Sequence, residues 1–357
     1  MTWIAISGQG TSWVCPKTFG MVGLQRDLLM PRGTIMIETR LSPEGSPQTL
    51  LAYRRSQPWF GSISFRAVPG GGVILVMTQG DDVFHTVLQH PDDARTDVLR
   101  VTYSWDSERG FGRIAVERPE SDSMTVQATP APPPMMYEDI HSLTCRPQLC
   151  ETDPDVVFFA VSDEIEPIGP APTMTGQVPV LTGAGYRPLS ELRTGDTVRT
   201  LGKDLVPVLA RVTRRVPALG SFQPIRLRAP YFGLKRDVVV APTQRLVIGG
   251  TDVEYLFGRE AVLVPAASLV NGFAAVRETA HLQVRYHHLL LPSHDPFVVA
   301  GVALESLYVG RLRRRRNLLA QTLLRDCPAG LLPEHARVGL KVLGPFEAIT
   351  LAEARAA

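Results

Sequence analysis

The first 165 residues alternate short apolar runs with turn-forming stretches. Residues 62–68, Ser-Ile-Ser-Phe-Arg-Ala-Val, alternate polar and apolar side chains, and residues 96–105 do so more loosely. Stretches rich in Gly, Pro, Asp and Ser separate further apolar runs at 34–41, 72–77, 113–117 and 155–161. A period of two places alternate side chains on one face of a strand, and no helical period interrupts the series. The pattern predicts a β-sandwich over residues 1–165.

The strand pattern resumes at residue 173 and continues to residue 310. Short apolar runs recur at 178–181, 197–201, 237–248 and 286–291, and Gly-containing turns precede several of them. The chain changes character after residue 310. Leucines at 318, 319, 323 and 324 have helical spacing, so the pattern predicts a helix over residues 313–324. The four arginines at 313–316 are read as its solvated start rather than as a nucleic-acid site.

A proline-rich stretch divides the two strand-rich regions. Pro167, Pro170 and Pro172 lie within residues 166–172, and such spacing is typical of a semi-rigid connector. We therefore predict an all-β protein with a jelly-roll-like sandwich at 1–165, a linker at 166–172, a second β domain at 173–310 and a helical tail at 311–357.

Composition and charge narrow the classes of function. A hydrophobic content of 44% with 20% charged residues indicates a folded chain, and a net charge of +2 gives no reason to expect nucleic acid as a partner. The N-terminus lacks a basic start and an apolar core, and no run of about eighteen apolar residues occurs. We expect no Sec signal peptide and no membrane span, and either a cytoplasmic location or export by a signal-less route.

The cysteines give no evidence of a metal site. The chain has four, and their spacing matches no zinc motif, so no metal and no cofactor is expected. Cys145 and Cys150 lie close together in CRPQLC. They form either a local disulfide or two unrelated thiols, of which we favour the second.

The order of motifs after residue 173 resembles that of the Hint (hedgehog/intein) domain in its stand-alone bacterial form. Thr173 falls on the opening cysteine of that family, Pro188 to Leu192 on its PVEDL element, and Gly195-Asp196 on its GD pair. Later matches follow in order: DVVVAPTQRLVI at 237–248, LVPAASLVNG at 263–272, YHHLLLPSH at 286–294 and ESLYVG at 305–310. The resemblance covers residues 173–310 and implies a Hint fold there.

In the Hint family a Cys, Ser or Thr side chain attacks the carbonyl that precedes it, and a Thr/Ser-x-x-His element and a later histidine assist. The resemblance therefore implies Thr173 as the nucleophile and the Pro172 carbonyl as its target. Ala241 and Gln244 replace the Ser/Thr and His of the assisting element. Glutamine cannot exchange a proton near neutral pH, although it can hydrogen-bond.

Two histidines complete the set of candidate catalytic residues. His294 matches the later family histidine, and His288 falls on another recurrent position. Each is either a residual proton-transfer group or a structural histidine that hydrogen-bonds across the fold; we favour the structural role. Thr173 has the same alternatives, because a strand-start hydroxyl needs no catalytic explanation. Any enzymatic activity is at most single-turnover autoproteolysis.

The first region resembles the concanavalin/laminin-G type of jelly roll, through the run RVTYSWD at 100–106 and the glycine turn after it. Such sandwiches bind sugars or protein surfaces, which makes Trp59, His85, His90 and Trp105 candidate contacts. Core packing for the tryptophans and solvation for the histidines are the favoured explanations.

Three hypotheses about function follow. In the first, the self-cleaving site is degenerate and the chain is a non-splicing binding or interaction protein. In the second, the chain cleaves slowly between Pro172 and Thr173 by an N–O acyl shift and releases the sandwich. In the third, the sandwich binds carbohydrate and the second domain is a passenger.

Overall fold

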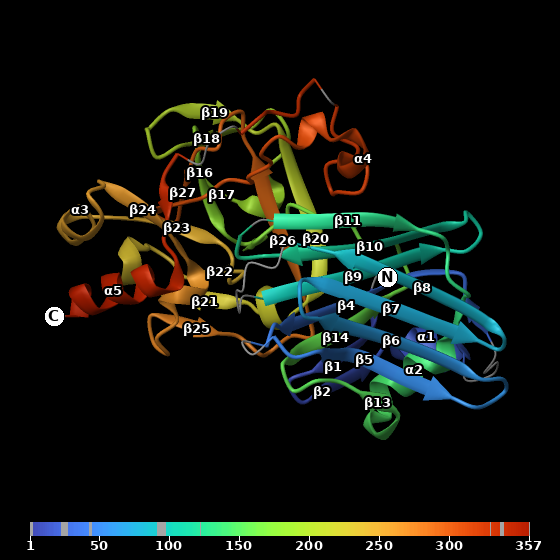
Figure 1. Cartoon of the computed structure of the whole chain (residues 1–357). Coiled ribbons are helices and arrows are strands. Elements are labelled where there is room, and N and C mark those ends of the chain that lie inside the picture. Colours follow the sequence, from blue (N-terminus) through green and yellow to red (C-terminus); the bar gives the residue numbers. More distant parts are fainter. Residues whose placement is uncertain are drawn as a thin grey trace. The chain divides into compact units, whose positions relative to one another are not determined.

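The computed structural model describes residues 3–22, 28–42, 45–90, 98–121, 123–328, 330–335 and 339–356, without the side chains of 21, 22 and 356. The chain divides into two compact units, Met1–Ile168 (unit 1) and Gly169–Ala357 (unit 2). Both consist mainly of antiparallel strands (Figure 1). The predicted all-β class is confirmed.

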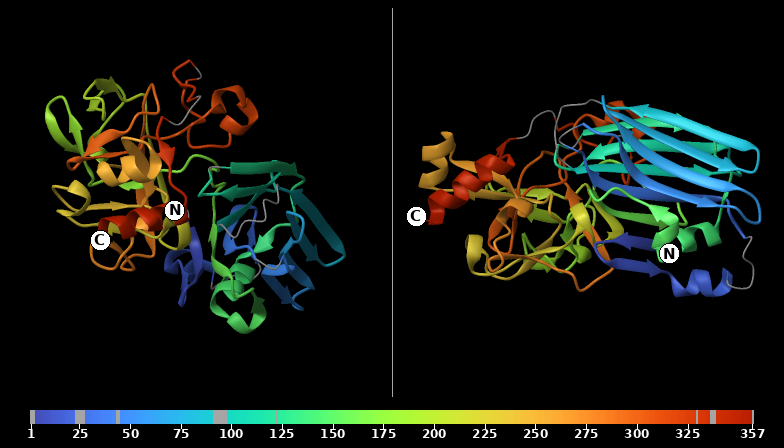
Figure 2. Two further views of the ribbon diagram at one scale, coloured as in Figure 1. Left: turned by 60° about the vertical axis from the view of Figure 1, so that its left-hand side comes forward. Right: turned by 60° about the horizontal axis from the view of Figure 1, so that its bottom comes forward.

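Unit 1 contains two large sheets, which Figure 2 shows as stacked layers. The seven-stranded sheet has the order β11 (Ser123–Thr129), β10 (Phe111–Arg118), β9 (Val98–Asp106), β4 (Arg32–Arg40), β14 (Val156–Ser162), β1 (Trp3–Gly8) and β2 (Thr11–Val14). The five-stranded sheet has the order β13 (Cys150–Glu151), β5 (Gln48–Arg55), β6 (Gly61–Val68), β7 (Gly72–Gln79) and β8 (Asp82–Gln89). A two-stranded ladder pairs β12 (Met135–Met136) with β3 (Leu29–Met30).

The core of unit 1 lies between the two large sheets. Ile35, Val101 and Trp105 from one sheet share a buried cluster with Phe65 and Leu75 from the other. This is the arrangement of a β-sandwich, in which alternate side chains of each strand face the opposite sheet. Two helices, α1 (Pro16–Val22) and α2 (Tyr137–Cys145), supplement the strands. The sequence pattern predicted neither helix.

Unit 2 is built on a six-stranded sheet of order β20 (Ala210–Pro217), β26 (Gln283–Leu290), β15 (Met174–Thr175), β22 (Val238–Val240), β21 (Ile225–Leu227) and β25 (Ala275–Arg277). A second sheet has the order β19 (Leu205–Pro207), β18 (Thr197–Arg199), β16 (Pro179–Thr182), β27 (Phe297–Val299), β28 (Val302–Leu304), β23 (Arg245–Gly249), β24 (Ala261–Pro265) and β29 (Lys341–Val342), with β17 (Gly185–Pro188) paired to β16. Helices α3 (Thr251–Phe257) and α5 (Pro345–Ala356) pack together.

The prediction of a helix over residues 313–324 is wrong. The structure has one short 3₁₀ turn, Leu312–Arg314, then α4 (Arg316–Leu319), then turns. The Thr322 hydroxyl donates to the Leu319 carbonyl and accepts from the Leu324 amide, so it replaces helical hydrogen bonds with local ones. Leu319 and Leu324 are buried in a separate apolar cluster of unit 2, which explains their spacing without a long helix.

The last residues belong to the core of unit 2. Strand β29 pairs in parallel with β24, and Leu343, Ala348 and Leu351 are buried in the main apolar cluster of the unit. Glu166 lies near the end of unit 1 and is bound to two of its strands. Its amide donates to the Thr34 hydroxyl, and its carbonyl accepts from Arg113.

Two further sequence expectations can be compared with the described residues. All four cysteines are free thiols, so Cys145 and Cys150 are not joined. No helix in the described ranges is long and apolar enough to cross a membrane.

Candidate functional site

Thr173 lies immediately before β15, a two-residue strand in the middle of the six-stranded sheet. Met174 pairs with His287 of β26 on one side and with Val240 of β22 on the other. The Ala241 amide donates to the Thr173 carbonyl. Thr173 is therefore held between two strands, only 7% exposed, with its side chain near groups from both neighbours.

The next residues of the same segment are packed as closely. Gly176 follows β15, and a Cβ atom there would lie 2.9 Å from Cβ of Ser190 and 3.0 Å from Nε2 of His287. Only glycine fits this position without displacing a neighbour. The glycine seen in the sequence thus allows the opening strand to pass close to β26.

The register of β26 decides which of its two adjacent histidines faces Thr173. Successive side chains of a strand point to opposite faces. His287 turns to the face of Arg211 and Thr213, with its Nδ1 2.8 Å from Arg211 Nη1 and 2.9 Å from Thr213 Oγ1. His288 turns to the other face, where its Nδ1 lies 3.1 Å from Thr173 Oγ1.

Gln244 approaches the same hydroxyl from the loop between β22 and β23. Thr173 Oγ1 lies 2.5 Å from Gln244 Oε1, and Gln244 is 1% exposed. The Gln244 Nε2 group donates to the carbonyls of Arg245 at 2.9 Å and of Glu305 at 3.3 Å, which fixes the orientation of the amide. Its oxygen can then only accept, so the Thr173 hydroxyl donates its single proton to Gln244.

The tautomer of His288 follows from its second contact. His288 Nε2 lies 2.9 Å from the Glu305 carbonyl oxygen, which can only accept, so Nε2 carries the proton and Nδ1 presents a lone pair to Thr173. Burial lowers the pKa of His288 to about 4, against the opposing effect of the Glu305 carbonyl. The imidazole is therefore neutral at neutral pH and a weak base.

Glu305 contacts the groups around Thr173 through both its backbone carbonyl and its side-chain carboxylate. Its carboxylate lies 3.1 Å from Arg245 Nη1 and 3.2 Å from His294 Nε2, and all three side chains are at most 9% exposed. Burial by itself would raise the pKa of Glu305, but the contacts with His294 and Arg245 hold that pKa below its usual range. Glu305 thus stays ionised and anchors the carbonyl that orients both His288 and Gln244.

Comparison with known proteins identifies this part of the chain. Residues 172–311 match the family model described as the Hint domain. Residues 172–311 are a Hint domain. No curated protein matches the chain.

Three solved structures illustrate what the two halves of the chain are similar to. The MchDnaB-1 intein is 14% identical, with 37% of this chain and 98% of that chain covered and a TM-score of 0.26. The AceL NrdHF class 3 split intein is 13% identical, with 39% and 100% covered and a TM-score of 0.28. The Ruminococcus gnavus IT-sialidase CBM40 is 14% identical, with 46% and 91% covered and a TM-score of 0.30.

Three of the four residues predicted for the Hint site meet in the structure: Thr173, Gln244 and His288. His294 has no hydrogen bond to Thr173; it contacts Glu305, and its ring packs against Tyr308 and His335, with ring centroids 4.9 Å and 5.5 Å away. His294 therefore lies against Glu305 rather than beside the Thr173 hydroxyl.

Sequence reasoning missed two residues of the Hint site, Arg245 and Glu305. Each had a signal: Arg245 directly follows Gln244, and Glu305 opens the ESLYVG motif. Neither signal says that the two side chains form a buried ion pair, because they are 60 residues apart along the chain. Only the pairing of Leu246 in β23 with Leu304 in β28 brings them together.

Proposed function

We propose that the chain is a non-splicing Hint-domain protein in which cleavage between Pro172 and Thr173 is suppressed, and that it acts as a binding or interaction protein. One observation supports the suppression most directly: the Thr173 hydroxyl donates its proton to the amide oxygen of Gln244 at 2.5 Å. An amide oxygen does not take that proton away near neutral pH.

The chemistry of an N–O acyl shift explains why this contact matters. Thr173 Oγ1 would have to lose its proton as it attacks the Pro172 carbonyl, and the Thr173 nitrogen would have to gain one as the peptide bond breaks. A threonine hydroxyl is far less acidic than a thiol, so it needs a base more than the family cysteine does. The base within reach is His288, whose pKa of about 4 makes it weak.

The experiment is intact-mass spectrometry of the purified full chain, held for days at neutral pH with and without hydroxylamine, which intercepts an ester. We expect one intact species for the wild-type chain and likewise one intact species for the Thr173→Ala variant, which differs only by the mass of the substitution. Fragments ending at Pro172 that disappear in Thr173→Ala would contradict the proposal.

A matched variant tests whether Gln244 is the cause of the suppression. Gln244→His returns an imidazole to this position, and we expect it to produce hydroxylamine-sensitive fragments that the additional Thr173→Ala change abolishes. If the Gln244→His chain stays intact while it remains folded, the amide is not what holds the hydroxyl inactive.

A second candidate function is slow self-cleavage with His288 as the base. The observation in its favour is that His288 Nδ1 carries a free lone pair 3.1 Å from Thr173 Oγ1, because its Nε2 proton is committed to Glu305. If the Thr173 O–H bond rotated away from Gln244, its proton would point at His288 Nδ1 and the imidazole could accept it. In that case the wild-type chain yields fragments over days, and His288→Gln stops them while Gln244→Ala accelerates them.

The binding role is assigned to the sandwich of unit 1, with a carbohydrate or a protein surface as its partner. The support is architectural: unit 1 has its own apolar core and shares no residue with the Hint site.

A further inference from the structure

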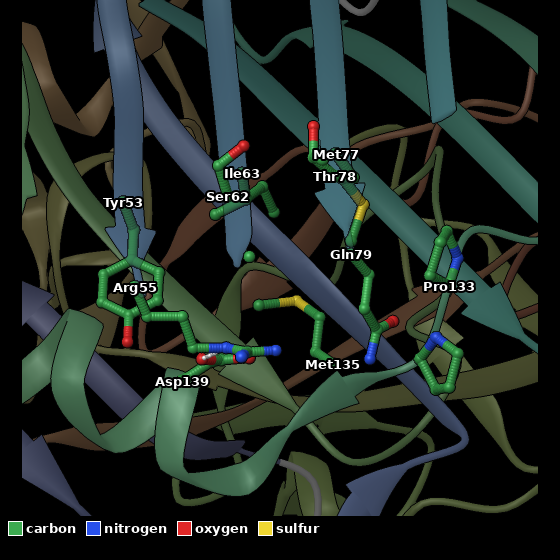
Figure 3. Close-up of a pocket in the computed structure, with 12 residues that line it drawn as sticks. Tyr53, Arg55, Ser62, Ile63, Met77, Thr78, Gln79, Pro133, Met135 and Asp139 are labelled. Atoms are coloured by element: carbon green, nitrogen blue, oxygen red, sulfur yellow. Dashed lines mark ion pairs between the residues drawn. The ribbon is translucent and has the colours of Figure 1, made fainter. Parts of the chain in front are cut away.

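Exposed aromatic rings lie beside an arginine in both units, but the two arginines differ in their access to solvent. In unit 1, Trp59 is 39% exposed and its ring centre lies 5.1 Å from the Arg55 guanidinium carbon. Arg55 Nε lies 2.8 Å from Asp139 Oδ1, both side chains are 9% exposed, and Figure 3 shows the pair next to Met135. The space enclosed there is about 20 Å³, which holds about one water molecule, so this arginine is closed to a partner.

The counterpart in unit 2 lies where three strands of the six-stranded sheet end together (Figure 1). Leu227, the last residue of β21, is paired on both sides, with the first residue of β22 and with the first residue of β25. The loop 228–237 and the segment 271–274 therefore leave the sheet next to each other. The Arg228 amide donates to the Ala274 carbonyl at 2.8 Å and joins the two segments.

An aromatic corner stands on these two segments. Tyr231 and Phe273 are 43% and 55% exposed, and their ring centroids lie 5.4 Å apart at an interplanar angle of 81°. The Tyr231 carbonyl accepts from the Leu234 amide at 3.0 Å, and the Asn271 side-chain oxygen accepts from the amides of Phe273 and Ala274. Both turns are held by hydrogen bonds, so a partner that contacts the rings does not have to order the backbone first.

The loop that carries Tyr231 also carries three exposed cations, Arg228, Lys235 and Arg236. The Arg228 guanidinium donates to the Phe273 carbonyl at 3.3 Å, which places it beside the aromatic corner. Among the described residues, none of the three cations has a carboxylate partner. An anionic group of a partner can therefore reach them without displacing an ion pair.

The carboxylates near the loop are occupied by a different arginine. Arg226 Nη1 lies 3.6 Å from Asp237 Oδ2, and Arg226 Nη2 lies 2.5 Å from Glu278 Oε1. Asp237 also accepts from the Ala229 amide at 2.9 Å. The three cations of the loop therefore present positive charge to solvent beside an apolar corner.

We propose that this corner docks an acidic peptide segment of a partner protein. An apolar side chain of the segment packs against the rings of Tyr231 and Phe273, and its carboxylates lie next to the three cations. Aromatic residues and arginine supply much of the binding energy at protein interfaces, and opposite charge on the partner fixes its orientation. The inference goes beyond the binding role of unit 1, because it places a second surface in the Hint domain.

A single-stranded nucleic acid also combines negative charge with flat rings, but it fits this surface less well. Successive bases stack on the faces of aromatic side chains, whereas two rings at 81° form a corner rather than a platform. The carboxylates of Asp237 and Glu278 would repel a continuous chain of phosphates, while a peptide can carry its acidic groups away from them. The rings and the charges together favour a peptide.

The test selects a phage-displayed library of random short peptides on the full chain, with the double variant Tyr231→Ala/Phe273→Ala as counter-selection. We expect the enriched peptides to carry Asp or Glu beside Leu, Phe or Trp. Synthetic copies, followed by fluorescence anisotropy, should bind Phe273→Ala roughly thirtyfold more weakly than the wild-type chain, the loss expected for one hot-spot residue. Arg228→Gln should weaken binding and flatten its dependence on salt.

Tyr255→Ala is the matched control. Tyr255 is an aromatic residue of the same unit, 89% exposed, and it belongs to α3 rather than to the two segments of the corner. Its replacement should leave peptide binding unchanged. Every side chain changed in the test is exposed, so the variants should fold, which the urea midpoint of unit 2 checks.

The proposal is overturned by a selection that enriches no acidic and apolar peptide, by peptides that bind Phe273→Ala as tightly as the wild-type chain, or by an equal loss in Tyr255→Ala. It is also overturned if oligothymidylate binds more tightly than the peptides and is lost in the same variants, or if the chain forms a dimer that Phe273→Ala dissolves. The corner lies at one end of β22, and β15 pairs at the other. Thr173→Ala should therefore bind the peptides equally well, and the cleavage proposal and this one fail separately.

Discussion

Acid should weaken unit 2 through the buried imidazole of His288. Its pKa is about 4 in the folded chain, against 6.5 for an exposed histidine, and burial is the main cause. Between these two values the unfolded chain binds a proton that the folded chain does not. The free energy of unfolding is therefore fully retained above pH 6.5 and falls as the pH drops toward 4. The difference corresponds to roughly 3 kcal/mol at its full extent, most of it lost by pH 4.5.

Two neighbouring groups define the window of the experiment. His287 has its pKa lowered to about 4 by burial and by Arg211, so it adds to the same slope. The pKa of Glu305 is held below its ordinary 4.5, and its contribution is therefore lost only at still lower pH. Measurements from pH 7.5 down to 4.5 isolate the histidines.

The assay is pulsed hydrogen exchange with mass spectrometry at one fixed labelling pH, after equilibration in urea at each test pH. The urea midpoint at which the peptides of β26 lose protection reports unit 2. All four tryptophans, at positions 3, 13, 59 and 105, lie in unit 1, so tryptophan fluorescence reports unit 1 in the same samples. The midpoint for β26 should fall with pH, and His288→Gln should flatten that slope. A midpoint independent of pH, or an equal slope in His288→Gln, would refute the reasoning.

Three further predictions concern thiols, the C-terminal helix and the buried ion pair. Cys145 is exposed and should react first with an aromatic disulfide at pH 8. Burial raises the pKa of Cys150 to about 11, so the Cys150 thiol should react slowly. Cys145→Ser should remove the fast phase of the reaction. Leu351→Ala should lower the stability of unit 2 by about 2–4 kcal/mol in the exchange assay, while Phe346→Ala on the exposed side of α5 should change it by less than about 0.5 kcal/mol. Glu305→Gln leaves the buried guanidinium of Arg245 facing a neutral amide and should lower the free energy of unfolding of unit 2 by about 3–5 kcal/mol. A loss below about 1 kcal/mol would show that the ion pair does not stabilise the unit.

Local pattern predicted the strands of both units because strand formation depends on neighbouring residues. The run at 62–68 alternates polar and apolar, and the structure has β6 at Gly61–Val68. The predicted run at 96–105 corresponds to β9 at Val98–Asp106, with residues 96 and 97 outside the described ranges. The helix over 313–324 was predicted from leucine spacing alone, and the local hydrogen bonds of Thr322 decided otherwise.

The candidate site was predictable as a set of residues but not as an arrangement. Motif order selected Thr173, Gln244, His288 and His294, and the family match agrees with the domain that those motifs implied. The motif order could not say which histidine faces the Thr173 hydroxyl, because that depends on the register in which β26 pairs with β15. A shift of one residue in that register would exchange His287 and His288.

The amino-acid sequence alone determined the two strand-rich regions and the Hint order of motifs, and it led to the prediction that Gln244 stands where the family has its assisting histidine, since each of these rests on residue type and spacing. Tertiary structure decided that the hydroxyl of Thr173 meets an amide oxygen first and an imidazole second. The reason is that contacts between distant segments depend on strand register and burial, and these are set by the packing of the whole unit.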